Sequence, residues 1–302
     1  TISTLVAPTL EQSSIPTLLF SEAPSYNSSQ SGEPTLIPSN VTYYQSSVTP
    51  TLMPNEVSFY AIAKNRGRTN LTSLLAELPN ENGEFLIHLG NWNTKDKTRC
   101  REVAYERTFD DYSNSSVPVF FTPGKNEWNN CPILDESQEL WRDYFVDYES
   151  EHWNVSDWGI ERDAKREENF AFFKNGGLYM GLNMVAGNVA NKKDWDNRLR
   201  DNHKWLEAYV NKYWDEVEVV VIFGNSGSNN DNDLFFQKVA ASMKEWLQEK
   251  PKLQLLYVKQ SPKDVTLSSN IKDQEHFLML NVKNDVWPPV KVTINTNNDK
   301  IS

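Results

Sequence analysis

The chain has 302 residues, of which 38% are apolar and ten are tryptophan, so it can bury a large core in one large domain or two ordinary ones. Its net charge of −11 argues against nucleic acid or an anionic membrane as a main partner, because both repel an acidic protein. No apolar run is long enough for a transmembrane helix, so no membrane span is expected.

Residues 1–54 differ in composition from the rest of the chain. About half of them are serine, threonine or proline, and they contain no lysine or arginine. The tripeptide Pro-Thr-Leu recurs at Pro8, Pro16, Pro34 and Pro50. This composition is typical of a disordered O-glycosylated stalk, but apolar residues are interleaved throughout. A proline-punctuated extended chain cannot build its own core, so we expect an arm that lies against its own body or against a neighbouring subunit.

Residues 55–302 alternate between strand and helix patterns. The predicted strands cover residues 57–63, 84–90, 117–122, 169–174, 178–185, 217–224, 253–259, 276–282 and 290–296. The predicted helices cover residues 68–78, 137–148, 191–214 and 231–249. Several strands are almost continuously apolar, as strands buried on both faces must be. The pattern predicts an α/β sandwich, with the acidic pairs Asp110/Asp111 and Asp231/Asp233 in solvated loops.

Ligands of such folds bind beyond the carboxyl ends of the strands. The segments FYAIAK, FLIHLGN, PGKNEWNNCP, LYMGLNMVAGNV and VVVIFGN end strands or follow them, in this order. In order and surroundings they resemble the calcineurin-like metallophosphoesterases, and more closely a secreted branch found in algae and other protists. The resemblance covers most of residues 57–296. It implies a β-sandwich flanked by helices, and in active members two divalent metals that activate water and clamp a phosphoryl oxygen.

The same resemblance implies that the metal ligands are lost in the first two loops. Lys64 stands where the first aspartate is expected, and Arg66 where a histidine is usual. Asn91 replaces the aspartate that bridges the metals. The site implied by the resemblance is therefore vestigial, beginning with these three residues.

The later loops continue this pattern. Lys125 replaces a ligand in the third loop, Asn126 occupies the position of its histidine, and Glu127 is retained. Asn225 replaces the histidine after the sixth strand, and Lys263 lies near a further histidine position. We therefore expect no bound metal or other cofactor and no catalysis.

Lysine at a metal-ligand position is the most informative departure, because an ammonium group cannot coordinate a cation and repels one. One hypothesis is that Lys64, Lys125 and Lys263 point into the pocket, substitute for the metals and pair with Glu127. The alternative is that these side chains face solvent, as most lysines do.

Several features predict an extracellular protein. Its two cysteines, Cys100 and Cys131, would be free thiols in the cytosol and a disulfide in a secreted protein. Five N-glycosylation sequons occur, at Asn27, Asn40, Asn70, Asn114 and Asn154. Attached glycans and a Cys100–Cys131 bridge are therefore expected.

These observations favour a secreted, non-catalytic glycoprotein that acts in extracellular assembly, as a fibre or surface subunit that self-associates through residues 1–54. One alternative is an active metal-dependent phosphoesterase with atypical ligands. Another is a glycan- or phosphate-binding receptor that uses the vestigial cleft, where Trp92 or Trp128 could stack on a sugar.

Overall fold

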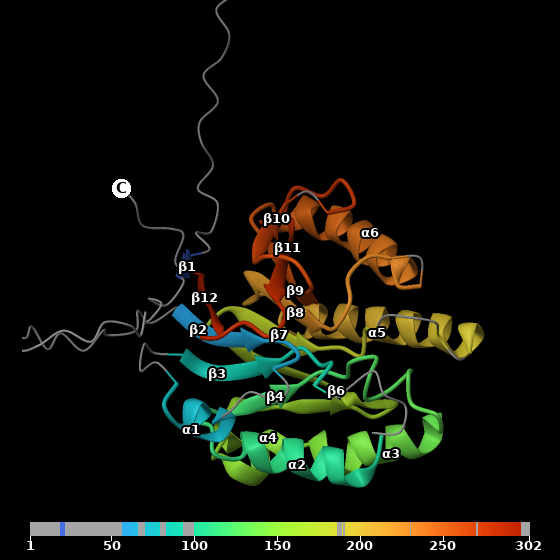
Figure 1. Cartoon of the computed structure of the whole chain (residues 1–302). Helices are drawn as coiled ribbons and strands as arrows, with labels where there is room; N and C mark the ends of the chain where they lie inside the picture. The colour runs from blue at the N-terminus through green and yellow to red at the C-terminus, as the bar shows by residue number, and fades with distance from the viewer. Residues whose placement is uncertain are drawn as a thin grey trace, which may run out of the picture.

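The computed structural model describes residues 19–21, 56–65, 70–78, 83–92, 100–185, 189, 191–229, 231–269 and 271–296. These residues form two sheets packed face to face, with α1–α4 on the outer side of one sheet and α5 and α6 on the outer side of the other (Figure 1). The predicted α/β sandwich flanked by helices is confirmed. Most of the predicted arm of residues 1–54 lies outside the described residues.

The first sheet holds the strands from the two ends of the chain. Within the described residues its order is β1 (Leu19–Ser21), β12 (Val290–Asn295), β2 (Glu56–Ile62), β3 (Gly83–His88) and β4 (Val119–Phe121). The neighbours β2, β3 and β4 are parallel, whereas β12 runs antiparallel to both β1 and β2. Its covering helices are α1 (Leu71–Ala76), α2 (Glu102–Tyr112), α3 (Leu134–Phe145) and α4 (Tyr148–His152). The parallel strands therefore all end at one edge.

The second sheet follows the same rule at its centre. Its order within the described residues is β10 (Thr266–Ser268), β11 (Phe277–Lys283), β9 (Gln254–Ser261), β8 (Val219–Gly224), β7 (Gly177–Gly181), β6 (Arg166–Lys174) and β5 (Glu161–Asp163). The strands β7, β8, β9 and β11 are parallel. The crossovers between β7, β8 and β9 are α5 (Lys192–Lys212) and α6 (Asp233–Glu249). A short 3-10 turn, η2 (Ser156–Trp158), precedes β5.

Aromatic side chains fill the space between the two sheets. Alternate residues of each strand point inward, since side chains alternate across a strand. On β3 the inward-facing Phe85 stacks on Phe59 of β2, with ring centroids 5.1 Å apart. It also meets the rings of Phe172 and Phe223 from the opposite sheet edge to face, at 5.5 and 6.1 Å. Phe85 therefore joins the two sheets at the centre of the sandwich.

The helices cover the outer faces through apolar stripes, as predicted. In α5 the buried residues include Trp195, Leu199, Leu206 and Val210, which recur at helical spacing. This helix begins at Asn191, whose side chain accepts a hydrogen bond from the Asp194 amide at 3.1 Å. The stripe predicted for residues 191–214 is core, as expected.

Helix α2 was not predicted, and its presence corrects one expectation. Asp110 and Asp111 lie in this helix rather than in a solvated loop. The sequence pattern that indicates this helix consists of aromatic residues. Tyr105, Phe109 and Tyr112 recur at helical spacing and share one face, while their neighbours are charged. In the part of the chain that the structure describes, no helix combines the length and the apolar character needed to span a bilayer.

We predict that Phe85→Ala lowers the free energy of unfolding by about 3–5 kcal/mol, because it opens a cavity at the contact between the sheets. Urea unfolding followed by tryptophan fluorescence measures the change. The control is Val103→Ala on α2, where the side chain is 65% exposed and the expected change is within about 0.5 kcal/mol. Equal losses for the two variants would contradict this account of the core.

Candidate functional site

The loops after β2, β3 and β4 meet because these parallel strands end at one edge. The Leu89 amide donates to the Ile62 carbonyl at 2.8 Å, and the Lys64 amide donates to the Gly90 carbonyl at 3.2 Å. On the other side of β3, the Thr122 amide donates to the carbonyl of His88 at 3.0 Å. These bonds continue the ladders of the sheet past the strand ends. They place the first three predicted loops next to one another.

Two of these loops touch through their backbones. A Cβ atom added at Gly124 would lie 2.0 Å from the Asn91 nitrogen, and one added at Gly90 would lie 2.5 Å from the Gly124 nitrogen. Gly90 and Asn91 have φ of 76° and 64°, and Lys64 has φ of 66°. Positive φ is uncommon outside glycine and persists where surrounding bonds enforce it. Side chains cannot be added between these loops without separating them.

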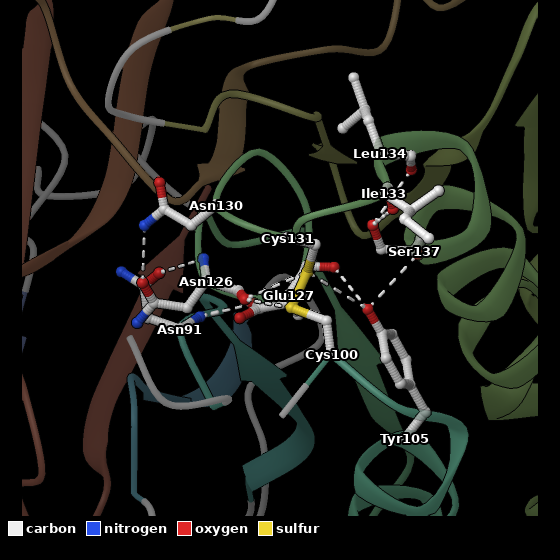
Figure 2. Close-up of a disulfide and its surroundings, with 10 residues drawn as sticks. All are labelled: Asn91, Cys100, Tyr105, Asn126, Glu127, Asn130, Cys131, Ile133, Leu134 and Ser137. Atoms are coloured by element: carbon white, nitrogen blue, oxygen red, sulfur yellow. Dashed lines mark hydrogen bonds between the residues drawn. A yellow bond between two sulfur atoms is a disulfide. The ribbon is translucent and has the colours of Figure 1, made fainter. Parts of the chain in front are cut away.

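The centre of the junction is the fully buried side chain of Glu127 (Figure 2). Its Oε1 accepts a hydrogen bond from the Asn91 amide at 2.6 Å, and its carbonyl accepts one from the Tyr105 hydroxyl at 2.8 Å. The Asn91 Oδ1 in turn accepts from the Asn126 amide at 3.3 Å. Burial is the main cause that raises the pKa of Tyr105, with the Glu127 charge second, so the phenol stays protonated as donor. The retained glutamate thus binds protein groups.

The asparagines at predicted ligand positions also bond to the protein. Asn126 Oδ1 accepts from Asn130 Nδ2 at 3.0 Å. Asn225, which follows β8, donates from Nδ2 to the Leu89 carbonyl at 2.7 Å and so links the two sheets. The Oδ1 of Asn225 is buried without a hydrogen-bond partner among the described residues. The structure therefore brings Asn91 and Asn126 together at Glu127, and it places Lys64 and Asn225 against the neighbouring loop at Gly90 and Leu89.

The predicted lysines do not share one arrangement. The Lys64 ammonium pairs with Asp285 at 3.4 Å, at a position where the two side chains are 34% and 51% exposed. Lys125 is half-buried, and its ammonium has no partner among the described residues. Lys263 is exposed, and its backbone amide donates to Ser261 Oγ. Lys263 thus matches the solvent-facing alternative rather than the pocket hypothesis.

A fourth lysine, Lys259, was not considered from the sequence. It lies near the end of β9, and its Cδ and Cε lie 2.7 Å from where a Cβ of Gly227 would be, in the loop after β8. Desolvation by burial lowers the pKa of its ammonium group. The available signal was its place as the last residue of the apolar run LQLLYVK, where a charged side chain must run along a buried strand. Arg66 lies outside the described residues.

His88 shapes the Gly90 turn. Its Nδ1 accepts a hydrogen bond from the Gly90 amide at 3.0 Å, and its ring stacks on Phe121 with centroids 5.4 Å apart. Desolvation lowers the pKa of this fully buried imidazole to about 3. It is therefore neutral at physiological pH. His203 lies elsewhere, between α5 and α6, where Nε2 is 2.9 Å from Ser242 Oγ.

The residues present do not fit a pair of divalent metals. Such a centre requires several carboxylate, imidazole or amide ligands with oxygen or nitrogen aimed at the metal. Among the described residues, no three His, Cys, Asp or Glu side chains gather in a metal-binding arrangement. The described residues at the predicted ligand positions supply one carboxylate, Glu127, together with amide and ammonium groups. We therefore derive no reaction step through a metal.

The predicted disulfide is confirmed between Cys100 and Cys131, whose Cα atoms are 5.6 Å apart. It joins Cys100, two residues before α2, to the end of the loop that contains Glu127 (Figure 2). The cysteines are 31 residues apart, and closing such a loop stabilises the fold by about 3–4 kcal/mol in the chain-entropy model. The bridge and the Tyr105 hydrogen bond hold this loop from the same helix.

The two tryptophans considered for sugar stacking are both buried in the core. Trp92 is 5% exposed and packs edge to face on Tyr105, with centroids 5.0 Å apart. Trp128 is 1% exposed and lies edge to face against Trp141 at 5.8 Å. Both rings already contact core aromatics, which leaves no face for a sugar.

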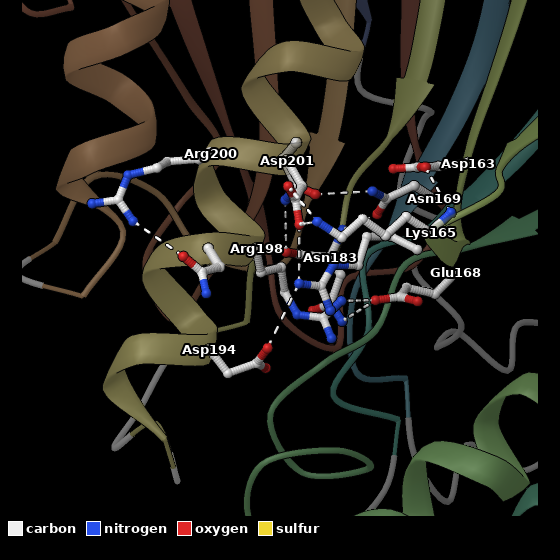
Figure 3. A network of polar contacts seen from close by, with 12 residues as sticks. Asp163, Lys165, Glu168, Asn169, Asn183, Asp194, Arg198, Arg200 and Asp201 are labelled. Carbon is white, nitrogen blue, oxygen red and sulfur yellow. Dashed lines mark hydrogen bonds and ion pairs between the residues drawn. The ribbon is translucent and has the colours of Figure 1, made fainter.

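The sequence did not predict a buried polar network that lies beside Trp128, in the loop after β4 (Figure 3). The Arg198 guanidinium of α5 pairs with the Glu168 carboxylate of β6, which also accepts from Asn183 Nδ2 at 2.9 Å. Arg198 lies 5.8 Å from the ring centre of Trp128. Removing one member would leave a buried charge uncompensated, so the set is structural. Polar residues inside the otherwise apolar stripe of α5 were the available signal.

Comparison with known proteins gives likeness at the level of fold. No protein-family model matches the chain, and no curated protein matches its sequence. Among solved structures, "Structure of PhoD" matches over 80% of this chain with a TM-score of 0.50 and 10% identity. A 5′-nucleotidase from Candida albicans SC5314 matches over 78% with a TM-score of 0.45 and 12% identity. The match covers 64% and 46% of those chains, so this chain spans less than two-thirds of either.

The first of these structures, matched at a TM-score of 0.50, has a metallophosphoesterase-type fold. At these identities the likeness establishes the fold alone. It agrees with the fold implied by the segments at the strand ends, and it leaves activity to be argued from the residues of this chain.

We predict that His88 makes stability fall as the pH drops. The unfolded chain binds a proton below pH 6.5, whereas the folded imidazole does so near 3, so the free energy of unfolding decreases through this window. The largest contribution is about 1.4 kcal/mol per pH unit. His88→Asn retains an acceptor for the Gly90 amide and should flatten the slope, as measured by urea unfolding at a series of pH values.

The same variant contains its own control. At about pH 8, where free histidine is neutral, the difference from wild type reports lost packing alone. Burial also lowers the pKa of His203, so part of the slope will persist. Parallel curves for the variant and the wild type across the acid range would contradict the assignment to His88.

Proposed function

We propose that this protein is a secreted, N-glycosylated pseudoenzyme, in which a metallophosphoesterase-like scaffold serves extracellular assembly through residues 1–54. The fold of the scaffold is described above. Secretion, the absence of catalysis and the assembly role are the proposal.

One observation carries the non-catalytic part. The described strand-end residues at which a phosphoesterase needs metal ligands are amides and ammonium groups around a single carboxylate, Glu127. That carboxylate accepts a hydrogen bond from the Asn91 backbone amide and so acts as a structural group. One carboxylate that is already hydrogen-bonded to backbone, with amides beside it, lacks the several anionic or imidazole ligands that a pair of dications needs. The site supports a closed loop junction better than it supports hydrolysis.

Two features support secretion. A disulfide persists in oxidising compartments, and Cys100 is bridged to Cys131. Of the five sequon asparagines, Asn70, Asn114 and Asn154 lie in the described part of the chain, and each is exposed. Asn27 and Asn40 lie outside the described residues. Exposure is what an attached glycan requires.

The arm has a docking mode that supports assembly. Within the described part of the arm, β1 pairs antiparallel with β12 at the edge of the first sheet, with Phe20 opposite Val292. Strand addition at a sheet edge binds through backbone hydrogen bonds, so the same edge accepts a strand from its own chain or from a second copy. Docking in a neighbour would join subunits head to tail, and such contacts generate rings or filaments.

We expect the purified full chain to contain no stoichiometric manganese, zinc or iron, and to hydrolyse no generic phosphodiester when Mn²⁺ is added. Inductively coupled plasma mass spectrometry measures the metals, and release of nitrophenol measures turnover. A known metal-dependent phosphoesterase assayed in parallel is the positive control. Stoichiometric metal together with turnover would favour the alternative, an active phosphoesterase with atypical ligands.

We expect the full chain to assemble and a chain lacking residues 1–54 to be monomeric, because assembly uses the arm. Light scattering after size-exclusion chromatography measures the mass, and circular dichroism checks that the body remains folded. Deleting residues 1–21 alone, which removes β1 and keeps the rest of the arm, tests strand addition in particular. An unchanged assembly mass after the longer deletion would rule out the arm as the connection.

A further inference from the structure

A groove of about 550 Å³ lies where α4 leads into η2. Its lining includes Asp147, Glu149, Glu151, His152, Trp153, Asn154 and Ile160. A volume of several hundred Å³ is that of a small-ligand site, and a sugar residue or two would occupy it. The groove is separate from the loop junction around Glu127.

Asn154 belongs to the groove and to the sequon Asn154–Val155–Ser156. The Ser156 hydroxyl donates to Asn154 Oδ1 at 2.9 Å, which fixes the orientation of the amide. The nitrogen of the same amide, Nδ2, has no partner among the described residues. Because Nδ2 is the atom that carries the sugar in an N-linked glycan, the attachment point lies at the groove itself.

Two of the three carboxylates that line the groove are already paired, since the Arg162 guanidinium contacts both Asp147, at 2.9 Å, and Glu149, while Glu151 faces solvent. Glu149 is 2% exposed, so its charge is neutralised inside the protein rather than offered to a cation. What remains for a ligand is a mixture of hydrogen-bonding oxygens and apolar surface.

The apolar surface comes from Trp153 and Ile160, both partly exposed. The indole nitrogen of Trp153 donates to the Ser115 carbonyl at 3.1 Å, so the ring is held in place and needs no further hydrogen bond. A fixed aromatic or aliphatic surface flanked by oxygen acceptors suits the carbon–hydrogen faces and hydroxyl groups of a sugar.

We propose that this groove seats the proximal N-acetylglucosamine residues of a glycan attached to Asn154. The inference rests on the proposed secretion and glycosylation. It adds that one glycan is bound along the protein surface, whereas the others extend freely. A seated glycan would cover the groove and keep this surface out of any assembly contact.

The chain provides two internal comparisons. Asn114 lies on the neighbouring turn, because the Trp153 indole bonds to Ser115, yet it does not line the groove. Asn70 precedes α1 and lies outside the groove as well. All three asparagines are exposed, so they differ in the presence of a groove rather than in accessibility.

The test uses the full chain secreted from a eukaryotic host. Glycopeptide mass spectrometry measures occupancy at Asn70, Asn114 and Asn154, and peptide N-glycosidase is then applied to the native protein over time. We expect Asn154 to be occupied and its glycan to be released about tenfold more slowly than those at Asn70 and Asn114. After denaturation the three rates should be equal.

A second variant separates seating from local sequence effects. Ser150 lines the groove and is exposed, so Ser150→Trp fills the space without removing the sequon. In this variant the native release rate at Asn154 should rise to that at Asn114, with the fold checked by circular dichroism.

Each remaining result would overturn the inference. Fast release at Asn154 in the wild type, or slow release that persists in Ser150→Trp, would show that the groove does not hold the glycan. If glycans are found at Asn70 and Asn114 but not at Asn154, the proposed glycan-binding groove is wrong, while the proposed secretion is still supported. The absence of glycan at all sequons would instead overturn the proposed secreted glycoprotein, and the seat with it.

Discussion

The hydrogen bond from the Asn91 amide to the buried carboxylate of Glu127 is the constraint on which the strand-end region depends. It fixes the loop after β3 against the loop after β4, at a distance so short that Gly90 and Gly124 leave no room for a side chain. The Tyr105 hydroxyl and the disulfide then tie the second loop to α2. A carboxylate that holds backbone in this way is committed to structure.

Because Glu127 is hydrogen-bonded to the Asn91 backbone amide, this edge of the sandwich is held closed by protein contacts. In a metal-dependent site, carboxylates converge on a cation, and the cation neutralises them. Here amide hydrogens hold Glu127, while Lys64 pairs outward with Asp285 and Asn225 bonds across to the carbonyl of Leu89. Local contacts hold this junction together. The same loops can therefore converge at the carboxyl edge and form a stable junction between the sheets.

The scaffold also separates its surfaces by role. The β12 edge accepts β1 through backbone pairing, and the exposed sequon asparagines Asn114 and Asn154 lie on adjacent turns beyond the helices of the first sheet. Helices α5 and α6 cover the opposite sheet, as Figure 1 shows. A strand added at the β12 edge would leave these exposed turns uncovered.

Much of the fold follows from local pattern. The strands β2, β3, β8 and β9 are buried on both faces, so their apolar runs could be predicted from the sequence. The apolar stripe of α5 was likewise predicted to be core. Helix α2 was missed because its buried face is made of tyrosine and phenylalanine among charges, a composition with weak periodic contrast. Charged residues inside apolar patterns, Lys259 and Arg198, marked positions that pattern alone left unexplained.

The sequence by itself determined most of the strands, the two long helices and the chemical types of the residues at the strand ends. It could do so because burial periodicity and residue chemistry are local properties. The tertiary structure alone decided what each of those groups touches. It paired Lys64 with Asp285, exposed Lys263, buried Trp92 and Trp128, and placed Asn154 at a groove. Those outcomes depend on side chains brought together from distant parts of the chain, and a sequence does not contain their distances.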